Sequence, residues 1–232
     1  MSSPLHSAAA GGDIPALLAL LNDGADIESA EDVRARPACS AAVPVQPAWL
    51  PPQLTPTAAQ GRTPLLEAAH HGQEQAVRLL LERGANPEAA NQARVQRWPL
   101  ARSSPRSHLR QGGKSALQYA AQYGHAEVAR LLLESGANTE TRNLYGWTAA
   151  HAAAYYGKPE AMKVLLEFGA QVEAVNDHGC TVLASAAKYG NLEVARLLLE
   201  QGADRAPRNA DGESALDLAR ECGCDELVRL LS

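Results

Sequence analysis

Aromatic side chains are scarce in this chain of 232 residues. They make up 4 % of it, with a single phenylalanine, so the core must be built from the aliphatic residues that dominate the 46 % hydrophobic content. No apolar run approaches the roughly 18 residues that a membrane-spanning helix needs. The N-terminal residues lack the basic start and apolar stretch of a secretory signal. We therefore expect an intracellular protein, cytoplasmic or nuclear, with reduced thiols at its four cysteines, Cys39, Cys180, Cys222 and Cys224.

Acidic side chains are missing from two segments of an otherwise acidic protein. The chain carries 26 acidic and 21 basic residues. Residues 34–60 contain two arginines and no acid, and residues 93–111 contain five arginines and no acid. The remainder of the chain is therefore strongly acidic. This difference indicates that the two segments do not belong to the same pattern as the rest.

A repeat of 33 residues organises the remainder. Gly-Ala pairs begin at Gly24, Gly84, Gly136, Gly169 and Gly202. A second glycine recurs at Gly61, Gly113, Gly146, Gly179 and Gly212. Successive members are 33 residues apart, except where the spacing is longer by 27 or by 19 residues. The longer spacings predict two insertions, at 34–60 and 93–111.

Each repeat carries the pattern of two short helices. In the third repeat, an Ala-rich segment at 115–123 ends at Gly124, and a second segment at 127–134 has Leu and Val at helical spacing. The Gly-Ala pair then ends the second helix, because glycine adopts the left-handed conformation without steric cost. One such helix pair cannot bury its apolar face alone, so we expect the pairs to stack.

These motifs resemble the ankyrin repeat family. Thr63-Pro64-Leu65 with Ala68-Ala69, and Ser3-Pro4-Leu5-His6 with Ala8-Ala9, are similar to its Thr-Pro-Leu-His-x-Ala signature. The resemblance implies an all-α ankyrin-repeat solenoid of helix-turn-helix units with short hairpin fingers. We expect unit one at 1–33, a Pro/Ala-rich disordered insertion at 34–60, unit two at 61–92, an Arg/Ser-rich disordered insertion at 93–111, and units three to six at 112–232.

The histidine of the signature is present only at His6 and His151. The other four units have Leu66, Gln118, Ala184 and Asp217 at this position. In the family this imidazole ties adjacent turns together. We therefore expect looser junctions where it is replaced.

The resemblance implies a non-catalytic protein–protein interaction module that binds through its concave face, as an intracellular adaptor or inhibitor. We expect a monomer with no cofactor and no membrane partner. Enzyme chemistry finds no support, because His70 and His71 have no Ser or Cys nucleophile in a suitable context and no phosphate-binding loop is present. Cys222 and Cys224 flank the glycine that every unit has between its helices, and no second cysteine pair completes a zinc site.

Aromatic residues recur at one position of the repeat, directly before the glycine between the two helices. The set at this position includes His71, Tyr123, Tyr156 and Tyr189, and unit four adds Tyr145, Trp147 and Tyr155. In the family this end of the inner helix and the finger tip face the partner-binding groove. We therefore predict that these seven residues, with Arg62 and Lys114, contact the partner, since Tyr and Trp concentrate binding energy at interfaces. The alternative is that the tyrosines only cover neighbouring helix ends.

Three interpretations of the insertions remain open. Both segments fit disordered loops at finger tips. The arginines at 94–110, with Trp98, also fit a loop that binds nucleic acid or an acidic surface. The third interpretation is that each segment is a retained intron, because each lies between intact repeats and ends at a Gln-Gly border.

Overall fold

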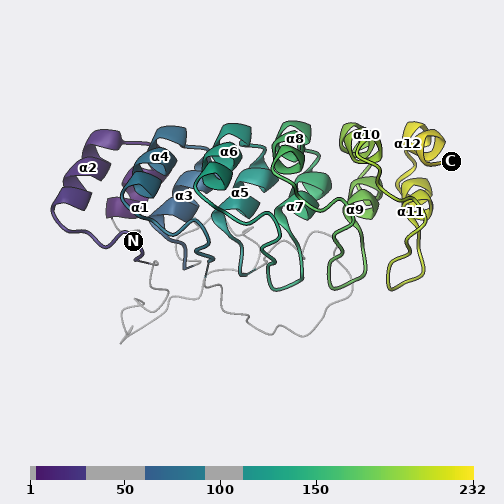
Figure 1. Ribbon diagram of the computed structural model, residues 1–232, viewed down its shortest axis with the longest axis horizontal. Coiled ribbons are helices and arrows are strands. Elements are labelled where there is room, and N and C mark those ends of the chain that lie inside the picture. The colour runs from purple at the N-terminus through teal and green to yellow at the C-terminus, as the bar shows by residue number, and fades with distance from the viewer. Residues whose placement is uncertain (1–3, 30–60, 92–111) are drawn as a thin grey trace, which may run out of the picture.

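The computed structural model describes residues 4–29, 61–91 and 112–232, and it is an all-α repeat solenoid. The described helices form two parallel rows, with odd-numbered helices in one and even-numbered helices in the other (Figure 1). They are α1 (Pro4–Gly11), α2 (Ile14–Asn22), α3 (Pro64–His71), α4 (Glu74–Glu82), α5 (Ala116–Tyr123), α6 (Ala126–Glu134), α7 (Ala149–Tyr156), α8 (Pro159–Glu167), α9 (Val182–Lys188), α10 (Leu192–Glu200), α11 (Ala215–Cys222) and α12 (Asp225–Leu231). The predicted fold class is confirmed.

Each inner helix from α3 onward begins after a Ser or Thr that caps it. The side chain of Thr148, for example, accepts a hydrogen bond from the backbone N–H of His151, which would otherwise lack a partner within the helix. The helix ends at Gly157, whose φ of 62° places it in the left-handed region. These local signals explain why the helices are only seven to nine residues long and why they recur at a constant period.

Buried alanines and leucines hold the helices together. The alanine pairs of the inner helices, such as Ala120 and Ala121, have no exposed surface, and neither do Leu132 and Leu198 of the outer row. Helix α3 packs against both α1 and α5, so the inner row is continuous on both sides of each insertion. The insertions therefore interrupt the sequence of the chain without interrupting its core.

A buried asparagine closes the base of each described finger. Asn143 accepts hydrogen bonds at Oδ1 from the backbone N–H groups of Tyr145 and Trp147, at 2.9 and 3.0 Å. Asn91 accepts in the same way from the N–H of Lys114, and its own N–H donates to the carbonyl of Lys114 at 2.9 Å. The described residues that flank the second insertion, Asn91 and Lys114, are thus joined as they would be in an uninterrupted finger. The two segments at 34–60 and 93–111 themselves lie outside the described residues, as do the expectations of disorder there.

Polar side chains link successive fingers, and one of them corrects an expectation. The His6 ring bonds the carbonyl of Arg62 at 2.8 Å, and the His151 ring bonds that of Cys180 at 3.1 Å. Gln118 makes the equivalent link, because its Nε2 donates to the carbonyls of Thr141 and Trp147. The expectation of a looser junction at Gln118 is therefore wrong: an amide has a donor and an acceptor, as a neutral imidazole has.

Candidate partner-binding surface

Four aromatic side chains of units four and five form one contiguous group, the aromatic row: Trp147, Tyr155, Tyr156 and Tyr189. Tyr155 lies at its centre, with its ring centroid 3.9 Å from that of Tyr189, 4.8 Å from that of Tyr156 and 5.1 Å from that of Trp147. All four side chains are partly exposed. Helix α7, the C-terminal end of α9 and the finger before α7 position them, and Tyr155 takes part in each of these ring contacts. The sequence predicted all four residues, and the structure brings them together.

A second group joins units two and three. This histidine–tyrosine cluster comprises His70, His71, Tyr119, Tyr123 and His125. The hydroxyl of Tyr123 lies 3.0 Å from Nε2 of His70, and the two ring centroids are 4.5 Å apart. Tyr123 remains 42 % exposed. Burial, reinforced by the positive charge of Arg62, lowers the pKa of His70 to about 4, so this ring is neutral near pH 7.

The pKa values of two tyrosines of the aromatic row, Tyr156 and Tyr189, are raised, so both hydroxyls keep their hydrogen near neutral pH. Burial, followed by the neighbouring phenols of Tyr155 and Tyr123, raises the pKa of Tyr156. Burial also raises the pKa of Tyr189, and its hydrogen bond with Tyr155 adds to the effect.

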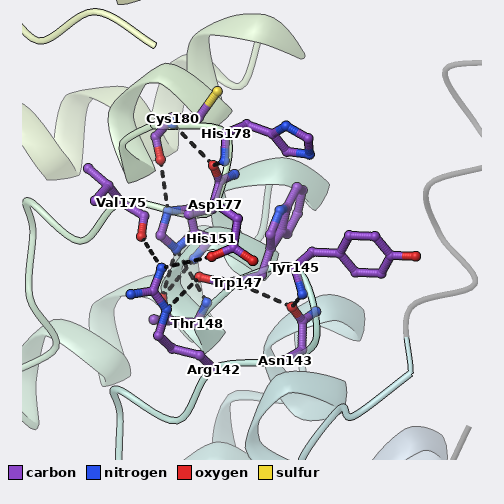
Figure 2. A network of polar contacts seen from close by, with 12 residues as sticks. Arg142, Asn143, Tyr145, Trp147, Thr148, His151, Val175, Asp177, His178 and Cys180 are labelled. Atoms are coloured by element: carbon purple, nitrogen blue, oxygen red, sulfur yellow. Dashed lines mark hydrogen bonds and ion pairs between the residues drawn. The ribbon is translucent and has the colours of Figure 1, made fainter. Parts of the chain in front are cut away.

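The fingers of units four and five extend the surface with apolar side chains. Tyr145 is 39 % exposed, and its chain neighbour Leu144 and Val175 of the next finger are also exposed. Figure 2 shows the Tyr145 ring pointing away from the finger, whereas His151 points into the polar network. Arg142 fixes the finger against its neighbour by donating to the carbonyl of Val175 at 2.6 Å. Trp147 instead packs on Tyr155 of the inner helix.

Two predicted contact residues, Arg62 and Lys114, are buried. Arg62 donates to both carboxylate oxygens of Glu67, at 3.2 and 3.3 Å, and its guanidinium lies 4.9 Å from the Tyr119 ring centroid. Lys114 donates to Gln122, and its Nζ lies 5.6 Å from the same ring centroid. Burial, together with the charge of Arg62, lowers the pKa of Lys114 to about 8. This differs from the expectation of two cations offered to a partner: both are held against the inner face of α5.

Tyr119, which is 3 % exposed and whose ring both cations approach, is not among the residues predicted from the sequence. A signal for it existed, because Tyr119 precedes Tyr123 by four residues and therefore shares its helix face. The aromatic ring explains how two like charges can share one buried site. Each cation approaches the negative face of its π-system. We infer that this buried group holds α5 in place. It thereby positions the exposed Tyr123 at the C-terminal end of that helix.

The described residues contain one group of three side chains with metal-binding geometry. Ligand atoms of Glu67, His70 and His71 all lie within 4.8 Å of one another. Both oxygens of Glu67 already face Arg62, so a metal ion there would have to displace or oppose a guanidinium. The arrangement fits an ion pair within the cluster better than a metal site.

Comparison with known proteins agrees with this architecture. The family described as ankyrin repeats (3 copies) matches residues 52–143, 89–176 and 168–232, which is well over half of the chain. The chain is also 36 % identical over 96 residues to ankyrin repeat and SAM domain-containing protein 6 of Mus musculus. That match covers 38 % of this chain and 11 % of the relative. The solenoid belongs to the ankyrin repeat family.

Members of this family are generally protein–protein interaction modules and are generally not catalysts. The surface described above fits that class, because aromatic side chains are exposed on rigid elements and not gathered in a deep pocket. Across the described residues, no helix is both long and apolar enough to cross a membrane.

Proposed function

We propose that the protein is a non-catalytic adaptor or inhibitor that binds another protein through the concave face formed by its inner helices and fingers. The observation that supports this proposal most strongly is the contiguous aromatic row of units four and five, continued by exposed Tyr145 and Tyr123. We further propose that it acts as a monomer inside the cell.

The side chains of the aromatic row have the physical properties of interface anchors. Tyrosine and tryptophan combine a large apolar area with a polar tip and lose little conformational entropy on binding. Here they are fixed by ring–ring contacts of 3.9–5.1 Å on short, capped helices. A partner would therefore meet a surface that is already ordered. Preordered surfaces bind at a lower entropic cost than flexible ones.

Capture from cell lysate with matched variants tests the proposal. The tagged full chain is compared with Tyr156→Ala and with Phe168→Ala. Phe168 is a suitable control because it is an aromatic side chain 39 % exposed at the end of α8, in the outer row. The proposal predicts a protein that the wild type and Phe168→Ala retain and Tyr156→Ala loses.

Two outcomes would contradict the proposal. Retention of every captured protein by Tyr156→Ala would remove the aromatic row from the interface. Capture that depends on nucleic acid, and that falls steeply with salt, would instead favour the arginine-rich segment 94–110.

A further inference from the structure

The residue that follows the glycine between the two helices of a unit contacts the preceding unit. In unit five, Asn191 lies on Gly157 and donates to the carbonyls of Ala154 and Tyr155, at 2.6 and 3.0 Å. Gln73 and His125 bond carbonyl groups of the preceding inner helix in the same way. In units two, three and five this position therefore carries a polar link to the preceding unit, and the glycine beneath it leaves room for the side chain.

The sixth unit has a thiol at this position. Cys224 lies on Gly190, and its Sγ is 3.0 Å from Sγ of Cys222, the last residue of α11. A Cβ atom added at Gly190 would lie 2.5 Å from the Cys224 sulfur and 3.0 Å from the Cys222 sulfur. Both sulfurs thus occupy the space above one glycine. The two side chains pair with each other where units two, three and five have the amide or imidazole of Gln73, His125 and Asn191.

Access to the pair is open from one side. Cys222 is exposed and Cys224 is partly buried. Cys222 therefore faces solvent as the attacking thiol, with Cys224 behind it as the resolving thiol. A disulfide requires an S–S distance of about 2.05 Å. The two sulfurs, now 3.0 Å apart, would need to approach by about 1 Å to reach this distance.

We propose that Cys222 and Cys224 are a reversible oxidation site that forms an internal disulfide with glutathione disulfide as the oxidant. The Cys222 thiol loses a proton, and its thiolate attacks one sulfur of glutathione disulfide. A mixed disulfide forms and one glutathione thiolate leaves. The Cys224 thiolate then attacks the Cys222 sulfur and expels the second glutathione. Two electrons pass to the oxidant and two protons from the protein, giving two molecules of glutathione.

The hydrogen bond between Cys222 and Cys224 slows the first step, the attack of Cys222 on glutathione disulfide. This bond, followed by burial, raises the pKa of Cys222. Since the thiolate is the nucleophile, the first step accelerates as the pH rises. The site is thus slow to oxidise at neutral pH but closes readily once the mixed disulfide has formed, because the second sulfur is already in contact.

The test uses the full chain and redox buffers of reduced and oxidised glutathione. After equilibration, free thiols are blocked with N-ethylmaleimide and peptides are identified by mass spectrometry. The expected product is one peptide with Cys222 and Cys224 linked, lighter by two hydrogen atoms, and fully restored to two thiols by dithiothreitol. Cys180, which lies in a finger away from the pair, serves as an internal control and should remain a blocked thiol.

Cys224→Asn is the matched variant, since it recreates the link that Asn191 makes in unit five. Its circular dichroism should match that of the wild type, and it should accumulate glutathione on Cys222 with no further reaction. The wild type should accumulate several-fold less of this mixed disulfide. Accumulation of the mixed disulfide in the wild type to the level of Cys224→Asn would overturn the proposal. Persistence of both thiols at every glutathione ratio would overturn it equally.

Discussion

Acid should weaken this solenoid partly through one buried histidine, His151. The ring has no exposed surface. Its Nδ1 accepts from the backbone N–H of Thr148 at 3.3 Å, so Nε2 carries the hydrogen and donates to the carbonyl of Cys180 at 3.1 Å. Burial lowers the pKa of His151 from 6.5 to about 4. The native protein therefore keeps this ring neutral at pH values where the unfolded chain protonates it.

The sign and size of the effect follow from this difference in pKa. The unfolded state binds the extra proton below about pH 6.5, so the free energy of unfolding falls as the pH drops from 6.5 towards 4. A tenfold difference in proton affinity between the native and unfolded states corresponds to about 1.4 kcal/mol. Between pH 7 and pH 4.5 the loss due to His151 should be about 2 to 3 kcal/mol.

His151→Gln is the appropriate comparison, because Gln118 occupies the same repeat position and makes equivalent links without titrating. Urea unfolding followed by circular dichroism at pH 7 and pH 4.5 gives the pH-dependent loss for each protein. The wild type should lose about 2 to 3 kcal/mol more than the variant. Equal losses in the two proteins would refute the assigned cause.

Three further predictions concern the architecture. Deleting residues 93–111 should leave a finger of normal length and an unchanged or higher unfolding midpoint by circular dichroism. Loss of the helical signal would show that the stacked core depends on the insertion. Leu132→Ala and Leu198→Ala, at positions without exposed surface, should each cost about 2 to 5 kcal/mol in urea unfolding, and costs below about 1 kcal/mol would argue against the stacked core. Limited proteolysis should cut first at 34–60 and 93–111 and leave a fragment near 112–232, whereas uniform resistance would show that the insertions pack.

The repeat pattern predicted the helices because the residues that begin and end each helix act locally. Glycines with positive φ and Ser or Thr caps act within a few residues of the chain, so Thr148 and Gly157 bound their helix from sequence alone. The aromatic row was predictable for a related reason. A constant period places Tyr156 and Tyr189 at the same end of neighbouring inner helices, and Tyr155 makes the ring contact with Tyr189.

Contacts that depend on chemical substitution between units were not predictable in this way. The link made by Gln118 requires that an amide can replace an imidazole across a 29-residue separation to Trp147. The burial of Arg62 depends on Tyr119 in the next unit, beyond the second insertion. Periodicity identifies the face of the repeat that a residue occupies. Whether its side chain is exposed or buried depends on the residues of the adjacent unit that it contacts.

Whether the aromatic row is an interface is decided by a paired measurement on Tyr156→Ala and Trp147→Ala. Folding is measured by circular dichroism and urea unfolding, and partner affinity by titration calorimetry, with Phe168→Ala as the control. We expect a nearly unchanged helical signal and a loss of about 1 to 4 kcal/mol of binding free energy for both aromatic-row variants, with little change for the control. Unfolding of the array by Tyr156→Ala, with unchanged affinity per folded molecule, would show that the aromatic row is packing and that partners bind elsewhere.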